Sequence, residues 1–419
     1  MEKVEVLCNN MSELKKYIEN DDDSYILINF NLSNKDIIEL QNDINFFKKQ
    51  YNIRYRYKYI PQFPKEFNLD YLNCMSNKII TEIPNSLINL QKLYCNNTNI
   101  RMIPYSLINL RFINCSNTLI TMIPKELINL HSLDCSYSKI TEIPKELINL
   151  RYLDCSTTNI KYIPKELINL HSLDCSYSSN IVKIPKELIN IIRLYCHYTN
   201  ITEIPKELIN LQELNCNNTK ISIIPKELVN LTKLDYYRTQ VTEIPKEFIK
   251  LQELRCTQTQ ITEIPKELIN LRELNCSNTK ITEIPKEFIN LQELYCSNTT
   301  ITKVPKELIK LKELYCKETQ ITEIPKEFIN LKILVCTLTK IKEIPKELIN
   351  LEYLDCLHTN IKKLPPTFYK LNSLFCNNLP FSIYKEISKE YECNKSRTDF
   401  IKHIFKFKST INCISILDH

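Results

Sequence analysis

A unit of about twenty residues recurs along most of the chain, and this repeat constrains the fold more than any other feature of the sequence. Its pattern is L-x-x-L-x-C-x-x-T-x-I-x-x-I-P-x-x-L-x-x, and its proline returns sixteen times between Pro64 and Pro365. One copy carries too few apolar residues to form a core of its own. The copies must therefore stack, so that each buries its apolar side chains against its neighbours.

Within one copy, alternating residues predict a short strand. In residues 211–216, Leu214 and Cys216 stand two positions apart and share one face, while Glu213 and Asn215 share the other. The proline that follows fixes φ and opens a return arm of five or six residues, which leaves room for one helical or 3₁₀ turn. We therefore predict one parallel strand per copy, joined by short segments.

This pattern resembles the leucine-rich repeat, L-x-x-L-x-L-x-x-N/C-x-L, over residues 53–380. The resemblance implies an α/β repeat solenoid, a horseshoe with a parallel sheet on its concave side and short turns or 3₁₀ segments on its convex side. Two departures stand out, because cysteine replaces the third leucine and threonine replaces the asparagine. The composition, without glycine or alanine, and this repeat variant are similar to those of the leucine-rich repeat proteins of giant DNA viruses of amoebae.

The residues that flank the repeats suit the capped ends that a repeat array needs. Residues 1–52 read as strand, helix, strand and helix, with strands in 4–8 and 24–30, and we predict an N-terminal α/β capping segment. The solenoid of about sixteen repeats occupies residues 53–380. Residues 381–419 lose the repeat and are predicted to form a mostly helical C-terminal capping segment.

The lack of glycine excludes several nucleotide-binding, ion-binding and catalytic motifs together. Walker loops, dinucleotide-binding loops, EF-hand loops and nucleophile elbows each need a backbone position that only glycine occupies without strain. No stretch fits a signal peptide or a membrane span, and a net charge of +6 is small for 419 residues. With eighteen cysteines and no export signal, we expect free thiols in a reducing intracellular compartment, such as the cytoplasm of an infected host cell.

The cysteines recur in step with the predicted strands from Cys74 to Cys376, with Tyr236 as the one substitution. Each lies on the inward face of its strand, where a thiol acts as a small hydrophobic group. A metal site would need close C-x₂-C pairs with polar access, and side chains in register keep Cβ atoms wider apart than a disulfide prefers. We predict core packing, with a metal or cluster site and a redox role as the alternatives.

We also expect the recurring threonines and the histidines near aspartates to have structural roles. The threonines from Thr98 onward are predicted to hydrogen-bond turning backbone across repeats, as the family's asparagine does. His131 and His171 lie near Asp134 and Asp174, but a Cys–His–Asp site is not expected because the thiols face inward and the carboxylates outward. We predict no catalytic residue, no metal site and no cofactor, and hence no enzyme.

The outward strand positions vary from copy to copy, whereas the convex P-K-E-L segment barely changes. Exposed tyrosine and phenylalanine beside aspartate and arginine are typical of protein-binding hot spots, although unconstrained drift would also produce variation. An acidic run from Glu213 to Glu313 favours a basic partner. We therefore predict a non-enzymatic protein–protein interaction scaffold whose concave face binds a host protein with a basic surface. The predicted partner-binding residues are Tyr71, Tyr94, Phe112, Asp134, Tyr152, Asp154, Asp174, Tyr195, Asp235, Arg255, Tyr295, Tyr315, Tyr353, Asp355 and Phe375.

Two other functions have some support in the sequence. Residues 53–60, IRYRYKYI, alternate basic and aromatic side chains as a single-stranded nucleic-acid site does, but no other basic stripe extends them. Nucleic acid, a membrane and a small-molecule substrate are therefore not expected as partners. The alternative function is an effector-like substrate-recognition module in which the C-terminal tail, with Cys393 and Cys413, has a catalytic or adaptor role.

Overall fold

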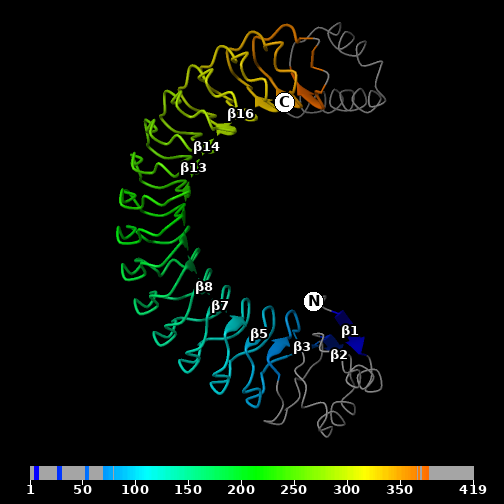
Figure 1. Ribbon diagram of the computed structural model, residues 1–419, viewed down its shortest axis with the longest axis vertical. Coiled ribbons are helices and arrows are strands. Elements are labelled where there is room, and N and C mark those ends of the chain that lie inside the picture. The colour runs from blue at the N-terminus through cyan, green and yellow to red at the C-terminus, as the bar shows by residue number, and fades with distance from the viewer. Residues whose placement is uncertain are drawn as a thin grey trace, which may run out of the picture. The chain divides into compact units, whose positions relative to one another are not determined.

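The structure is a computed structural model, which describes residues 69–376 except 79, 366 and 369, together with the backbone of three earlier strands. The chain divides into two compact units, Met1–Ile221 (unit 1) and Ser222–His419 (unit 2). In each unit, parallel strands line one side and turns line the other (Figure 1). Within the described part of the chain, no helix has the length and hydrophobicity that a membrane crossing requires.

The described strands of unit 1 form one parallel ladder. β1 pairs with β2, β2 with β3, and β3 with the first complete repeat strand, β4. The strands predicted in residues 4–8 and 24–30 are thus confirmed, while the helices predicted between them lie outside the described residues. The strands of unit 1 are β1 (Val4–Cys8), β2 (Ile26–Phe30), β3 (Asn52–Tyr55), β4 (Tyr71–Asn73), β5 (Lys92–Tyr94), β6 (Phe112–Asn114), β7 (Ser132–Asp134), β8 (Tyr152–Asp154), β9 (Ser172–Asp174), β10 (Arg193–Tyr195) and β11 (Glu213–Asn215).

Unit 2 continues the same pattern with one strand per repeat. Consecutive strands pair in parallel with equivalent residues side by side, as Leu254, Leu274 and Leu294 show. The predicted C-terminal capping segment, 381–419, lies outside the described residues. The strands of unit 2 are β12 (Lys233–Asp235), β13 (Glu253–Arg255), β14 (Glu273–Asn275), β15 (Glu293–Tyr295), β16 (Glu313–Tyr315), β17 (Ile333–Val335), β18 (Tyr353–Asp355) and β19 (Ser373–Phe375).

The core consists of the inward side chains of the repeat. In the repeat that contains β14, Leu271, Leu274, Cys276 and Ile281 are all fully buried. Tyr236 takes the cysteine position in its own repeat and is fully buried as well. Burial of this apolar row against the equivalent rows of its neighbours is the main force that holds the repeats together.

Two consecutive turns form the return arm. The amide of Leu268 donates to the carbonyl of Pro265 (3.2 Å), and the amide of Leu271 donates to the carbonyl of Leu268 (3.1 Å). These bonds between residues three apart close turns without a regular helix in the described residues. The prediction of short turns on this side is therefore confirmed.

The threonines bond to turning backbone as predicted, but the prediction that these bonds cross between repeats was wrong. The hydroxyl of Thr279 donates to the carbonyl of Cys276 at 2.6 Å, three residues back in the same repeat, and the other threonines of the row bond in the same way. The link between repeats comes instead from an asparagine in the return arm, since Asn270 Nδ2 donates to the carbonyl of Ile249 at 2.8 Å. The signal for this asparagine row was its regular recurrence in the I-N-L segment.

In the described repeats from Ser76 to His358, the turn after the strand contains a residue in the left-handed backbone conformation, although the chain has no glycine. The residue two positions after each core cysteine, or after Tyr236, has φ between 50° and 61°, from Ser76 to His358. Asparagine tolerates this conformation and occupies five of the positions. Elsewhere, as at Tyr177, cross-repeat hydrogen bonds such as that from its amide to the carbonyl of His197 (2.9 Å) hold the turn.

Candidate protein-binding surface on the strands

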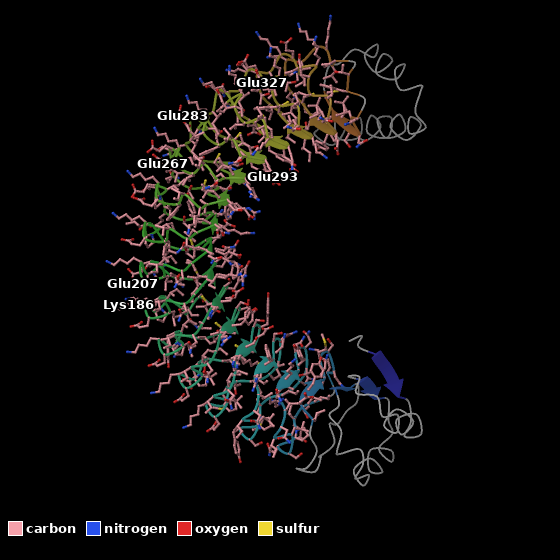
Figure 2. All side chains as sticks on the ribbon, viewed as in Figure 1. Lys186, Glu207, Glu267, Glu283, Glu293 and Glu327 are labelled. Atoms are coloured by element: carbon pink, nitrogen blue, oxygen red, sulfur yellow. The ribbon has the colours of Figure 1, made fainter. Side chains whose placement is uncertain are left out.

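The outward side chains of the three-residue strands form what we name the strand face. Each strand has a first outward position before its central residue, which is a buried leucine in most strands, and a second one after it, as Glu293 and Tyr295 show around Leu294. All fifteen predicted partner-binding residues occupy one of these two positions. Figure 2 shows Glu293 on this side of unit 2, whereas Glu267, Glu283 and Glu327 lie on the opposite side.

The five aspartates among the predicted residues have a structural task. Each accepts a hydrogen bond from the backbone amide two residues later, which caps the turn at the end of the strand. Asparagine does the same at other repeats, as the bond from the amide of Ser116 to Asn114 Oδ1 (3.1 Å) shows. In these repeats the cap therefore needs an oxygen acceptor but not its charge, while other repeats have a residue such as Val335 at the same position. The amide-to-Oδ1 distances are 3.1 Å for Asp134, 3.0 Å for Asp154, 2.9 Å for Asp174, 3.4 Å for Asp235 and 3.3 Å for Asp355.

In unit 1, three of these aspartates lie side by side. The pairing of β7, β8 and β9 brings Asp134, Asp154 and Asp174 into register. Burial raises the pKa of the Asp154 carboxyl, and the hydrogen bonds from Ser156 partly offset this effect. Burial and the neighbouring aspartates also raise the pKa of Tyr152 to about 12. This part of the strand face is acidic, but each carboxylate is held by its own turn.

In unit 2, the two predicted tyrosines Tyr295 and Tyr315 stack against each other. Their ring centroids are 4.6 Å apart and the rings are inclined by 16°. The hydroxyl of Tyr295 donates to Glu293 (3.1 Å) and to Glu313 (3.3 Å). Burial, and then these two carboxylates, hold the pKa of Tyr295 well above its usual range, so the hydroxyl stays a neutral donor. We name these four residues the Tyr–Glu patch.

The predicted acidic run is neutralised along part of its length. Lys233 pairs with Glu253 at 2.9 Å, and Arg255 pairs with Glu273 at 2.7 Å. Among the described residues, no cation forms an ion pair with Glu293 or with its direct neighbour in register, Glu313. Because like charges side by side on a sheet repel each other, the Tyr–Glu patch is the part of the run best prepared to accept a cation.

The structure brings other predicted residues into smaller pairs. Tyr71 and Tyr94 lie 5.5 Å apart between ring centroids, and Tyr353 and Phe375 are separated by the same distance. The ammonium group of Lys92 lies over the ring of Phe112 at 5.7 Å. The Tyr353–Phe375 pair begins on β18, two strands after the Tyr–Glu patch, whereas the other two pairs lie on β4, β5 and β6 of unit 1, so the fifteen predicted residues do not form one continuous cluster.

An aromatic cluster that was not predicted lies beyond the strand ends of unit 1. Tyr177 and Tyr198 stack at 4.6 Å with an inclination of 9°, and His197 packs edge-on against Tyr177 at 5.2 Å. The Nδ1 atom of His197 lies 2.8 Å from Ser176 Oγ. In the sequence, this cluster is indicated by Tyr177 and Tyr198 at equivalent positions of two successive repeats. The Nδ1 atom of His131 makes a polar contact with its own turn, 2.7 Å from the carbonyl oxygen of Asn129.

The cysteine row adds no chemistry to the strand face. The described cysteines are free thiols, and all are buried except Cys376, which is half-buried, so the prediction of core packing is confirmed. Burial raises the pKa of Cys276 to about 12, and a protonated, inaccessible thiol is neither a nucleophile nor a metal ligand. The described residues contain no group of histidine, cysteine, aspartate or glutamate side chains arranged to hold a metal ion.

Comparisons with known proteins agree with this geometry. The family model described as Leucine Rich Repeat matches residues 270–291, and no curated protein matches the sequence. The functional domain of InlJ from Listeria monocytogenes, which includes a cysteine ladder, superposes with a TM-score of 0.68 at 24% identity over 73% of this chain and 72% of that one.

Two further solved structures match over most of this chain. The plant peptide hormone receptor RGFR1, in complex with RGF2, superposes with a TM-score of 0.64 at 20% identity over 93% of this chain and 80% of that one. The Arabidopsis receptor kinase HAESA, in complex with the peptide hormone IDA, superposes with a TM-score of 0.64 at 19% identity over 90% of this chain and 76% of that one. At these identities the likeness concerns the fold, a parallel-sheet leucine-rich repeat solenoid with repeats of about twenty residues.

Proposed function

We propose that this leucine-rich repeat solenoid is a non-enzymatic protein-interaction scaffold that binds a partner with a basic surface through the Tyr–Glu patch of unit 2. The observation that carries the proposal is the stacked pair of Tyr295 and Tyr315 beside two carboxylates without a cation. Tyrosine rings attract the flat face of a guanidinium group, and carboxylates form charge-assisted hydrogen bonds with it. An arginine of the partner would satisfy both.

The acidic groups of the two units differ in whether they accept hydrogen bonds from the backbone of their own turns. The aspartates of unit 1 already accept hydrogen bonds from their own turns, and a partner would compete with those bonds. Glu293 and Glu313 bond to the hydroxyl groups of Tyr295 and Tyr315, and neither accepts a hydrogen bond from the backbone amide of a turn among the described residues. Partner binding at the Tyr–Glu patch therefore breaks fewer interactions that the fold needs.

The partner would present basic side chains on an extended segment or a flat surface. Equivalent residues of adjacent parallel strands are about 4.8 Å apart, so Glu293 and Glu313 form a closely spaced pair of negative charges. Solved complexes of RGFR1 with RGF2 and of HAESA with IDA show that proteins of this fold bind peptides. These complexes support peptide or protein binding in general, and the basic character of the partner rests on the charges of the Tyr–Glu patch.

The proposal includes a reducing compartment, such as the cytoplasm of a host cell that a giant virus infects. What supports the compartment is the row of free, buried thiols, and what supports the viral source is the composition and the repeat variant. The alternative with a catalytic or adaptor tail concerns residues outside the described part of the chain and stays a prediction.

Binding of arginine-rich peptides tests the function. The full chain is titrated with fluorescent peptides that differ only in arginine content, and affinity is followed by anisotropy at two salt concentrations. We expect Tyr295→Ala/Tyr315→Ala to weaken binding by about 30-fold, since an aromatic hot spot contributes about 2 kcal/mol. Glu293→Gln/Glu313→Gln should weaken binding and also reduce its dependence on salt.

The matched control removes the same charge from the other side of unit 2. Glu263 and Glu283 are exposed, and Figure 2 shows Glu283 away from the strand face. Glu263→Gln/Glu283→Gln should bind like the wild type. Equal losses in the control and in the patch variants, or equal affinity for arginine-rich and acidic peptides, would refute the proposal.

A further inference from the structure

A period of two repeats marks the start of four successive strands of unit 1. In residues 110–115 and 150–155, an arginine and then an aromatic residue precede the buried centre of the strand. In residues 130–135 and 170–175, a histidine and a serine take the same two positions. The arginine comes one residue before its strand, and the aromatic residue is the first outward position of that strand. We name four of these residues the Arg–aromatic patch, namely Arg111, Phe112, Arg151 and Tyr152.

Hydrogen bonds between repeats fix the separation of the two halves of the patch. The amide of His131 donates to the carbonyl of Arg111, and the amide of Arg151 donates to the carbonyl of His131, both at 2.8 Å. The register of β6, β7 and β8 likewise places a serine between the two aromatic residues. Equivalent residues of adjacent parallel strands are about 4.8 Å apart, so the two arginines, and also the two aromatic residues, are separated by about 9.6 Å along the backbone ladder.

The two arginines are available to a ligand. Both are exposed, and neither forms an ion pair within the part of the chain that the structure describes. The ring of His131 between them is held against its own turn, since its Nδ1 atom lies 2.7 Å from the carbonyl oxygen of Asn129. His171 makes the same contact with Asn169. Each guanidinium group can therefore form two charge-assisted hydrogen bonds with a carboxylate of a ligand.

The aromatic residues of the patch offer apolar surface beside these charges. Phe112 is 40% exposed and Tyr152 is 39% exposed. Ser132, which lies between them in the register, is half-buried and short, so a small side chain separates the two rings. The ammonium group of Lys92 lies 5.7 Å from the centroid of the Phe112 ring and adds a third positive charge at this end of the patch.

The separation within the patch indicates the conformation of its ligand. A polyproline II helix has three residues per turn, so side chains three residues apart lie on one side of it at a spacing of about 9.3 Å. Residues on one side of a β-strand are about 6.6 Å apart, and successive turns of an α-helix are about 5.4 Å apart. The polyproline II spacing agrees best with the patch. Proline favours this conformation, and segments of this kind dock on aromatic side chains.

The charges of unit 1 favour an acidic protein segment over a nucleic acid. Asp134, Asp154 and Asp174 lie on the same strands as the patch or on the next one, at the second outward position. A single-stranded nucleic acid follows a continuous basic groove with a phosphate on every nucleotide, so its backbone would approach these carboxylates. Arg151 and Asp154 are three residues apart, which corresponds to about 10 Å along a strand. A short segment that crosses only the starts of the strands leaves the aspartates uncovered.

We propose that the Arg–aromatic patch binds an acidic, proline-rich segment of a partner protein in the polyproline II conformation. Carboxylates three residues apart in the segment pair with Arg111 and Arg151. The prolines between these carboxylates pack against Phe112 and Tyr152. The basic side chains of the patch thus meet opposite charge, and the spacing of the two repeats meets one turn of the ligand.

This second surface goes beyond the proposed function and does not depend on it. The Arg–aromatic patch belongs to unit 1 and selects negative charge, whereas the Tyr–Glu patch belongs to unit 2 and selects positive charge. One chain would thus bind two segments of opposite charge, either from two partners or from one.

Fluorescence anisotropy with the full chain tests the spacing of the ligand. The probe is a labelled peptide with glutamate at every third position and proline at the positions between. The comparison peptide has the same composition, but its glutamates are adjacent to one another at one end. We expect the probe to bind at least about tenfold more tightly than the comparison peptide, since only the probe places carboxylates at both arginines together.

Substitutions in the patch test its residues. Arg111→Gln/Arg151→Gln should weaken binding of the probe by about 30-fold, and Phe112→Ser/Tyr152→Ser by about tenfold. Arg111→Lys/Arg151→Lys keeps the charge but not the two parallel hydrogen bonds, so its loss should lie between the wild type and the glutamine variant. Glutamine and serine already occupy the equivalent positions of other repeats, as Gln91 and Ser132 show, so these variants should fold. Circular dichroism verifies that they do.

The matched control removes the same charge from the return arms of unit 1. Lys165 and Lys186 are exposed, and Figure 2 shows Lys186 on the side opposite to the strands. Lys165→Gln/Lys186→Gln should bind the probe like the wild type, and so should Tyr295→Ala/Tyr315→Ala. Equal affinity for the two peptides, equal losses in the control and in the patch variants, or tighter binding of an oligouridine RNA that displaces the probe would overturn the proposal.

Discussion

In unit 1 the acidic side chains of the strand face, except Glu213, come after the buried leucine of each strand, whereas in unit 2 most of them come before it. Asp154 is at the second outward position and accepts a hydrogen bond from the amide of Ser156 (3.0 Å). Glu273 is at the first outward position and pairs with Arg255 of the preceding repeat at 2.7 Å. The two carboxylates have the same charge and face the same way, but one bonds within its own turn and the other bonds to a neighbouring repeat.

This difference shows that the place of a residue within the repeat decides its task. At the second outward position the chain is about to turn, so a short acidic or amide side chain is within reach of a free backbone amide. At the first outward position the backbone is paired on the sheet, so a longer carboxylate reaches only other side chains. Exposure and charge therefore do not separate the residues that cap a turn from those that contact only other side chains, whereas local hydrogen bonding does.

The largest effect should come from the core that both units share, beneath the two different faces. Leu153 and Leu274 are the fully buried residues next to Asp154 and Asn275. We expect Leu153→Ala and Leu274→Ala each to lower the free energy of unfolding by about 3 kcal/mol, because each leaves a cavity. Urea unfolding followed by circular dichroism measures the effect. If the two substitutions lowered the free energy of unfolding by clearly different amounts, the cores of the two units would not be equivalent. The strand faces of the two units could then not be compared on an equal basis.

A smaller effect is expected at the turn cap of unit 1. Asp154→Ala removes the acceptor for the Ser156 amide and should reduce the free energy of unfolding by about 1 kcal/mol. Asp154→Asn keeps an oxygen acceptor, as Asn114 does in its own repeat, and should be close to the wild type. Hydrogen exchange of the Ser156 amide would report the loss locally. If alanine and asparagine were equally tolerated, the carboxylate would not be a structural cap.

The smallest effect is expected at the ion pair of unit 2. The side chain of Arg255 is 50% exposed, and solvent-exposed ion pairs contribute little to stability. We expect Glu273→Gln to change the free energy of unfolding by about 0.5 kcal/mol or less, with a weak dependence on salt. A loss as large as that of Asp154→Ala would mean that unit 2 uses its carboxylates for folding as unit 1 does.

Much of the fold could be predicted from the spacing of residues alone. The strands, the buried cysteines and the short turns follow from a twenty-residue period and from leucine and cysteine two positions apart. The partner of the threonines could not be predicted, since the hydroxyl of Thr279 has carbonyls of two repeats as alternatives and only the path of the turn brings Cys276 O to 2.6 Å. The left-handed turns were also hidden, because the residue that usually marks them does not occur in the chain.

The candidate site was predicted in part. The alternation of side chains identified the strand face and all fifteen residues on it, because a strand has only two faces. It did not separate Asp134, Asp154 and Asp174, which cap turns, from Tyr295 and Tyr315, which do not. That distinction depends on hydrogen bonds between atoms whose separation is set by the turn.

The sequence by itself therefore determined which side chains point into the core and which point out, because that choice depends only on periodicity. The tertiary structure alone decided which outward groups meet. Tyr295 and Tyr315 are twenty residues apart in the chain, and their rings stack at 4.6 Å because parallel pairing places equivalent residues of successive repeats side by side. Contacts between repeats depend on register and on side-chain conformation, which no single repeat contains.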